Sequence, residues 1–198
     1  MTDTAIHLEP IERRYIDVPI EGITPVIVHK WSEKAKGIMA EAQGGSKVRA
    51  KREPKVPQAE AEAALYRLPD GTPGFPATAF KAASVGAVRL FQGITMTATK
   101  AALFIHGEGP DQLVVLEGEM AMRQDTPRNA TGVADLRYRY AFWPWSTVLH
   151  VEYLPALIDE ESAVRLIDAG GNGGVGDWRP SAPKSSTGTF GRYRVVGL

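Results

Sequence analysis

Five cations crowd into one short segment of the sequence, residues 47–55, against a single acid, Glu53. The cations are Lys47, Arg49, Lys51, Arg52 and Lys55. Such a segment can neutralise the phosphates of a nucleic acid and make binding depend on salt. A solvated surface loop has the same composition, so both interpretations stay open. Because Pro54 and Pro57 disfavour regular structure, we expect a charged insertion here.

A second group of residues joins glycines to cations and a tryptophan near the end of the chain. Residues 170–176 include Gly173, Gly174 and Gly176, and Trp178 and Arg179 follow directly. Successive glycines leave backbone N–H groups open to an anion, and aromatic and Arg side chains suit bases and phosphates. No Gly-Lys-Ser/Thr follows, so this is no P-loop. A merely flexible connection is the other interpretation.

Two more arginines belong to this candidate site because they alternate on the last predicted strand. Arg192 and Arg194 are two residues apart and therefore share one face of that strand. The alternative is a surface that carries ordinary ion pairs. We expect these arginines to contact phosphate together with the glycine-rich segment.

The histidines give little support for catalysis or metal binding. His7, His29, His106 and His150 form no i, i+4 pair and accompany no repeated acidic cluster, so we expect no metal and no cofactor. The chain has no cysteine, which excludes disulfides, thiolate metal sites and a cysteine nucleophile. His29 ends the first predicted strand, where a general acid or base could face a cleft. A lone histidine is more often structural.

An aromatic run, residues 138–145, interleaves rings with Arg139 and Pro144. It could stack bases, but large aromatic side chains dominate cores and interfaces, so we favour core or subunit packing. Pro144 argues against one continuous strand across the run.

The hydrophobic pattern predicts elements that could hold these groups. We expect strands with one buried face and helices with apolar stripes, the last helix capped by Asp159 and ended by Gly170. The predicted strands are 14–28, 101–106, 113–117, 120–123, 136–140, 146–154 and 189–196. The predicted helices are 32–43, 76–91 and 159–169.

This order predicts an α+β fold with a ferredoxin-like βαββαβ core, a basic insertion and an extra β-hairpin. We expect one domain over residues 1–198, with insertions at about 44–75 and 107–135. Lys plus Arg and Asp plus Glu both number 23, and hydrophobic residues make up 43%. The start of the chain is unlike a signal peptide, and no apolar run is long enough to cross a membrane. We therefore expect a cytoplasmic protein that does not bind membranes.

Several segments resemble a family of uncharacterised proteins from tailed phages and prophages. The similar segments are 28–35, 65–71, 74–77, 174–180 and 188–193. This resemblance implies a phage origin and a bacterial host cytoplasm. It implies no particular mechanism.

The placement of Gly170–Gly176 between the last helix and the last strand is similar to that in the RAMP superfamily of CRISPR-associated proteins. The resemblance implies an RRM-like or RAMP-like fold. It also implies single-stranded RNA as a partner and homo-oligomers that assemble along the strand. Our leading hypothesis is a non-catalytic protein that binds single-stranded nucleic acid, RNA before DNA.

Two other classes of function remain open. The first is a metal-independent RNA endonuclease with His29 as acid or base, similar to RAMP processing nucleases. The second is a structural or partner-binding phage protein, with the aromatic run at a subunit interface.

Overall fold

The computed structural model describes residues 7–31, 56–127, 134–183 and 186–198, together with positions 37, 40, 41 and 43. Those four single positions are helical, in agreement with the helix predicted over 32–43. The basic segment 47–55 lies outside the described residues. The described parts form a mixed α+β fold with two antiparallel sheets, which confirms the predicted class.

The larger sheet is organised around one long strand. The C-terminal half of strand β8 (Arg137–Tyr153) pairs on one side with β1 (Arg14–Gly22). On the other side, the last residues of β8 pair with β5 (Leu103–His106). The short last strand β9 (Tyr193–Val195) pairs with the outer edge of β1. Every one of these pairings is antiparallel, and the strand order is β9–β1–β8–β5.

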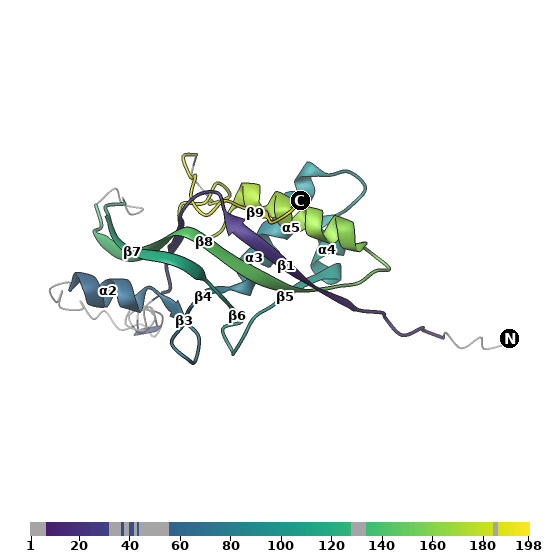
Figure 1. Cartoon of the computed structure of the whole chain (residues 1–198), viewed down its shortest axis with the longest axis horizontal. Helices are drawn as coiled ribbons and strands as arrows, with labels where there is room; N and C mark the ends of the chain where they lie inside the picture. The colour runs from purple at the N-terminus through teal and green to yellow at the C-terminus, as the bar shows by residue number, and fades with distance from the viewer. Residues whose placement is uncertain are drawn as a thin grey trace.

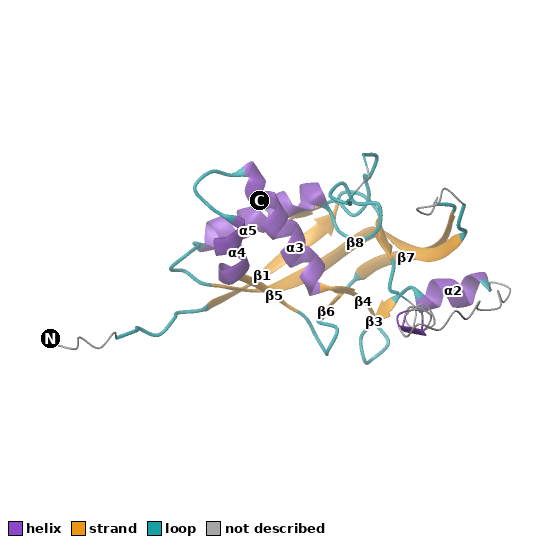
Figure 2. Cartoon of the chain, turned by 180° about the vertical axis from the view of Figure 1, so that it is seen from behind, coloured by secondary structure: helices purple, strands orange, loops and turns teal. Residues whose placement is uncertain are grey.

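Helices cover one face of this sheet. Helix α3 (Ala77–Ala87), the short 3-10 helix η1 (Val88–Leu90), α4 (Met96–Ala102) and α5 (Glu160–Gly173) lie behind the strands in Figure 1 and in front of them in Figure 2. Apolar side chains of β1 and β8 face them, because alternate strand residues point to one side. Among them Val18, Leu149 and Val151 are at most 2% exposed.

The two main helices touch closely at a pair of glycines. A β-carbon added to Gly170 would lie 2.9 Å from the backbone nitrogen of Ser84 on α3. One added to Gly171 would collide with the carbonyl oxygen of Tyr193 on β9. These glycines are therefore packing positions inside α5, not the start of a loop. The prediction that Gly170 ends the helix is wrong, because α5 continues to Gly173.

The N-terminal half of β8 is part of a long hairpin that extends beyond the helices. There β8 pairs with β7 (Glu117–Asp125) on one side and β2 (Val26–Val28) on the other. Figure 1 shows this hairpin extending away from α4 and α5. The sequence predicted an extra β-hairpin without assigning strands to it, and β7 is longer than the strand predicted over 120–123.

Pro144 lies within β8, contrary to the prediction that it would interrupt the strand. The register with β7 shifts between Gly118 and Met120, so β8 bulges at residues 143–144. On its other side β8 pairs with Glu21 and next with Val26, and the intervening residues 22–25 have no ladder partner there. The missing N–H of Pro144 therefore removes no ladder bond.

A second, smaller sheet lies below the long strand β8 in the view of Figure 1. It contains β3 (Tyr66–Arg67), β4 (Pro73–Pro76) and β6 (Leu113–Val115) in that order. Helix α2 (Pro57–Ala63) precedes it and packs against β8. Pro57 is tolerated because it starts the helix, where its missing N–H has no helical acceptor. The expectation that Pro57 would disfavour regular structure is therefore wrong.

Candidate nucleic-acid groove

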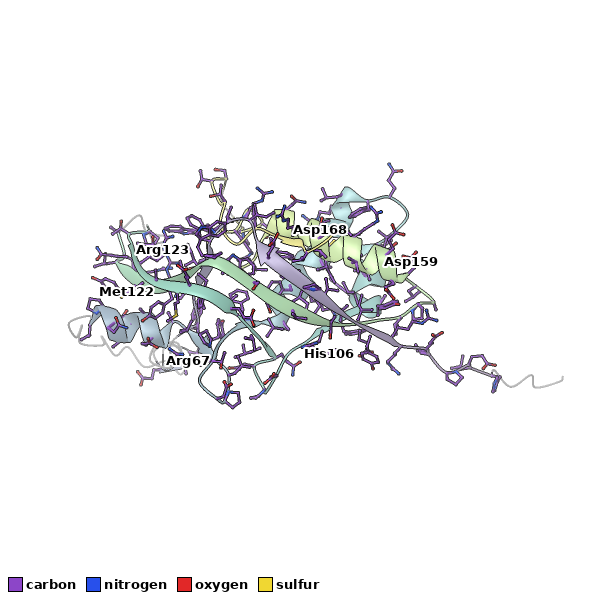
Figure 3. The ribbon with its side chains drawn as sticks, in the orientation of Figure 1. Arg67, His106, Met122, Arg123, Asp159 and Asp168 are labelled. Carbon is purple, nitrogen blue, oxygen red and sulfur yellow. The ribbon has the colours of Figure 1, made fainter. Side chains whose placement is uncertain are left out.

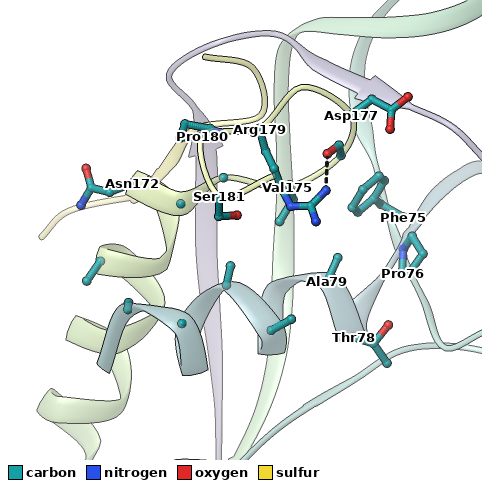
Figure 4. Close-up of a pocket in the computed structure, with 18 of the residues that line it drawn as sticks. Phe75, Pro76, Thr78, Ala79, Asn172, Val175, Asp177, Arg179, Pro180 and Ser181 are labelled. Carbon is teal, nitrogen blue, oxygen red and sulfur yellow. Dashed lines mark hydrogen bonds between the residues drawn. The ribbon is translucent and has the colours of Figure 1, made fainter. Parts of the chain in front are cut away.

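A groove of about 870 Å³ lies between helix α3 and the glycine-rich segment that follows α5. Its walls are α3 on one side and residues 172–181, which include Val175, on the other (Figure 4). The groove is also lined by Phe75, His29 and Tyr66. Segments from four distant parts of the sequence therefore meet at this one surface.

The α3 wall consists of small side chains. Thr78, Ala79, Ala82, Ala83 and Gly86 line the groove along successive turns of the helix. Helix residues three or four apart share one face, so these positions form a shallow surface that an extended chain could approach.

Arg179 projects from the opposite wall toward α3, as Figure 4 shows. One of its guanidinium nitrogens donates to the carbonyl oxygen of Gly176 at 2.9 Å, which fixes the side chain and leaves four other N–H donors. Among the described lining residues, the other basic groups are His29 and Arg89, and Asp177 is the one carboxylate.

The glycine-rich wall is itself packed against the rest of the chain. The N–H groups of Gly174, Val175 and Asp177 donate to the carbonyls of Gly170, Gly191 and Ile27 at 3.1, 2.9 and 3.0 Å. These N–H groups are therefore not open to an anion, contrary to the sequence-based expectation. At this wall the side chains, above all Arg179, offer donors to a ligand.

A chain of charged side chains fastens this wall to the hairpin. His29 Nδ1 and Asp177 Oδ2 are 2.9 Å apart, and Arg139 makes a very short bond to the same Asp177 oxygen. Arg139 also bonds Asp125 at 2.6 Å, and Arg123 bonds Asp125 through Nε and an amino group. Arg139 is 1% exposed, so its charge depends on these two carboxylates.

The two carboxylates keep their charge despite their surroundings. Burial raises the pKa of Asp177, but the bond and charge of His29 and then those of Arg139 outweigh it, so the pKa lies below its ordinary value. The same balance holds for Asp125, where Arg123 and Arg139 outweigh burial and lower the pKa. Asp177 is therefore an ionised group already neutralised by its partners.

Trp178 lies behind the groove wall and caps this cluster of charges. Its ring lies 5.1 Å from the guanidinium carbon of Arg139 and 5.4 Å from that of Arg123. The Phe190 ring stands 5.9 Å away, and Arg123 lies 4.9 Å from it. Trp178 has φ +56, an uncommon conformation for a bulky residue, and it points the indole onto the arginines.

The structure brings together only some of the residues predicted to bind. His29, Gly173, Gly174, Gly176 and Arg179 line one groove, although Gly173 belongs to helix α5. The other predicted binding residues lie elsewhere. Trp178 faces the arginine cluster, Arg194 bonds Glu21 on β1, and Arg192 bonds Asn172 at 3.3 Å. The predicted binding residues Lys47, Arg49, Lys51, Arg52 and Lys55 lie outside the described residues.

Two further histidines are held by acids on the outer face of the sheet. His106 Nε2 and Glu152 Oε2 are 2.9 Å apart, and His150 Nδ1 and Asp17 Oδ1 are 2.6 Å apart. Figure 3 labels His106 in this region, on β5. Neither pair lines the groove. Within the part of the chain that the structure describes, no group of three or more His, Asp or Glu side chains is placed to hold a metal ion.

The sequence reasoning overlooked Asp177, Arg139, Asp125 and Arg123, which hold the groove wall in place. Asp177 stands 148 positions from His29, so their contact leaves no trace in local spacing. Arg139 was seen only as a cation within the aromatic run. The one usable signal is that Arg123 has an aspartate two residues away, at Asp125.

No family model matches the chain, and no curated protein matches its sequence. The resemblance to phage proteins therefore stays a prediction. No helix within the described ranges is both long and apolar enough to cross a membrane.

Two solved structures resemble the chain in shape. One is the cryo-EM structure of the type III-B Cmr-beta bound to cognate target RNA, with a TM-score of 0.43 and 11% identity over 93% of this chain. This chain spans 59% of the length of that one. The other is Cmr6 from Pyrococcus furiosus, with a TM-score of 0.43, 10% identity, and coverage of 94% of this chain and 100% of that one. We base no functional conclusion on these two likenesses.

Proposed function

We propose that this protein is a non-catalytic binder of single-stranded nucleic acid that holds the phosphate backbone in the groove between α3 and residues 172–181. One observation carries the proposal: Arg179 projects into the groove, and the acid beside it, Asp177, contacts His29 and is paired with Arg139. The groove therefore presents positive charge without an unpaired carboxylate to repel a phosphate.

The shape of the groove supports an extended ligand. Its α3 wall is formed by alanines, a glycine and a threonine, and a backbone can approach such a wall closely. Tyr66 lies among the lining side chains and is only partly buried, so its ring could contact a base or a sugar. RNA is the first ligand to test, because the resemblance to the RAMP superfamily implies RNA.

The arrangement of elements is the reason to propose a ferredoxin-like, RAMP-like core. The elements β1, α3, β5, β8, α5 and β9 follow one another along the chain, and the order in the sheet is β9–β1–β8–β5. This is the split βαβ arrangement, in which each helix connects strands that flank a third. We extend the proposal to Lys47, Arg49, Lys51, Arg52 and Lys55 as further phosphate contacts, and to assembly along the strand.

The test is a fluorescence-anisotropy titration of a labelled RNA oligonucleotide with the Arg179→Ala variant. Loss of a charge-assisted bond to phosphate should weaken binding about tenfold or more. The slope of log K against log salt should fall by about 0.7, the value for one phosphate on a single strand.

The matched control is Arg137→Ala, which removes a partly exposed guanidinium that bonds Asp135 and does not line this groove. Its binding should stay within about twofold of the parent. If both variants bind as the parent does, the groove is not the site. If the parent shows no salt-dependent binding to RNA or DNA, a structural or partner-binding role replaces the proposal.

A second candidate function is favoured by one specific contact. Asp177 accepts a hydrogen bond from His29 Nδ1 when that nitrogen is protonated, and this fixes the tautomer that leaves Nε2 as a base. An imidazole oriented in this way beside Arg179 is suited to metal-independent RNA cleavage. RNA processing that persists in EDTA and disappears in His29→Gln, while binding stays within a few-fold, would establish this alternative.

A further inference from the structure

An N-terminal arm, residues 7–13, leaves the body of the protein and carries two exposed apolar side chains. Residues 7–13 precede β1 and extend away from the sheet and the helices in both Figure 1 and Figure 2. Leu8 is 81% exposed and Ile11 is 62% exposed. The base of the arm is held on the sheet, where Arg13 Nε lies 3.1 Å from Glu152 Oε1.

The sequence of the arm presents both apolar side chains on one side. Pro10 stands between Leu8 and Ile11 and favours an extended, polyproline-like backbone. Such a backbone has about three residues per turn and rises about 3.1 Å per residue. Leu8 and Ile11 are three residues apart, so they project in the same direction about 9 Å from each other. An arm that is already extended loses little conformational entropy when it binds.

A separate groove of about 480 Å³, lined by polar as well as apolar side chains, lies at the helical end of the molecule. Residues 91–94 form one wall and the turn 155–158 between β8 and α5 forms the other. Leu166 and Ile158 are buried at its base, while Phe91 and Leu157 are 40% and 54% exposed at its rim. Exposed apolar rings and branched side chains around a groove are typical of an interaction site.

We infer that the arm of one copy of this chain binds in this groove of a second copy, with Leu8 and Ile11 against Phe91 and Leu157. The arm points away from its own body, and the pairing of Arg14 with Tyr153 together with the Arg13–Glu152 bond fixes that direction. Arg14 pairs with Tyr153, two residues before Pro155 of the groove, so the arm would have to bend at its base to enter its own groove.

Charge supports the same pairing. The arm carries Glu9, whose side chain is 84% exposed, and Glu12. The groove is lined by Arg165, which also bonds the exposed Glu161 at 2.6 Å, and its one acid, Asp159, accepts from the N–H of Ser162. An acidic arm beside an arginine at the groove is a complementary arrangement.

The contact joins two different surfaces, so it repeats from copy to copy rather than closing on itself. It concerns assembly alone and requires neither RNA nor the proposed groove at α3. Its failure therefore leaves the proposed binding of nucleic acid in the groove at α3 untouched, and binding of a short RNA of about ten nucleotides measures that binding separately.

The experiment is sedimentation velocity of nuclease-treated protein over a range of concentrations. We expect the parent to associate as its concentration rises. The double variant Leu8→Asp with Ile11→Asp should associate on the order of 100-fold more weakly, and Leu157→Asp should show a similar loss. The control Met122→Asp changes an equally exposed apolar side chain on β7, at the opposite end of the molecule (Figure 3), and should associate as the parent does.

A mixing experiment tests the head-to-tail geometry. The arm variant keeps an intact groove and the Leu157→Asp variant keeps an intact arm, so an equal mixture should form dimers that do not grow further. Circular dichroism checks that each variant is folded, and Leu157→Ser replaces Leu157→Asp if the latter is not. A parent that stays monomeric, or a mixture that forms no dimer, overturns the inference.

Discussion

Replacing Arg139 with methionine tests whether the buried charge cluster holds the groove wall in place. Methionine keeps most of the length of the side chain and removes the guanidinium that bonds both Asp125 and Asp177. Each of these carboxylates retains one partner, Arg123 for Asp125 and His29 for Asp177. The variant therefore weakens the cluster without leaving a carboxylate wholly unpaired.

The expected loss follows from the bonds removed. A hydrogen bond to a charged group contributes about 1.5–3 kcal/mol, and breaking a buried ion pair costs about 3–5 kcal/mol. Asp177 is about one-third exposed and both acids keep a partner, so we take the lower end of that range. We expect the free energy of unfolding to fall by about 3 kcal/mol, which lowers the melting temperature by roughly 6–12 °C.

The loss should depend on pH in a defined direction. The folded-state pKa values of Asp125 and Asp177 lie below their ordinary value of 3.8, so these groups stabilise the fold above that value. This stability disappears as pH falls through the folded pKa values. Because Arg139 contributes to both shifts, the difference between parent and variant should narrow from about pH 5 downward.

Urea denaturation followed by tryptophan fluorescence at several pH values measures both effects. The control is Arg137→Met, which alters the same strand two residues away, where the arginine is 36% exposed and bonds Asp135. That variant should lose less than about 1 kcal/mol. Equal losses for the two variants, or a difference that stays constant with pH, would refute the reasoning.

Three smaller changes test the packing and capping of the helices by thermal denaturation. Gly171→Ala should lower stability by about 2 kcal/mol or more, because its β-carbon would collide with Tyr193; a neutral result would show that α5 can move away from β9. Gly86→Ala should raise stability by about 0.5–1 kcal/mol, since nothing lies within 4 Å of that β-carbon, and a loss would contradict this. Asp159→Ala should lower the melting temperature by roughly 2–4 °C at neutral pH, because Asp159 accepts from the N–H of Ser162. That N–H holds the pKa of Asp159 below its usual value, so the difference in melting temperature between parent and variant should vanish in acid. A difference that persists in acid would show that the loss does not come from the charged cap.

The sequence predicted the elements whose signals are local. Strand β1 shows alternation, α5 begins with Asp159 and two glutamates, and α3 has apolar residues at helical spacing. The mixed α+β class with an antiparallel sheet follows from such signals. The helix α4 was missed because its start depends on one side chain, Thr95, which accepts from the N–H of Ala98.

The errors arose where a tertiary contact overrides a local preference. Gly170 and Gly171 indicated a helix end, but α5 continues through them because Ser84 and Tyr193 approach too closely for side chains. Gly174 and Gly176 indicated a flexible loop with open N–H groups. The loop instead packs on the edge of β2, which no spacing within the loop can show.

The candidate site was predictable in part. Arg179 and His29 line the same groove, but no local spacing connects them to α3, whose alanines are simply good helix formers. The charge cluster that supports the wall unites residues 29, 123, 125, 139 and 177. Such a set forms only when three segments meet, so it requires the fold.

The bulge in β8 acts as a phase change along the strand. Before it, Tyr140 and Phe142 face the core at 6% and 1% exposure; after it, Trp145 and Leu149 do so at 3% and 0%. The buried positions therefore switch from even to odd numbers across residues 143–144. Deleting a single residue there would force a choice between turning Tyr140, Phe142 and Arg139 to the opposite faces and turning Trp145 and Leu149 into water. A substitution of Trp143 or Pro144 should be tolerated far better than a one-residue change in the length of the strand.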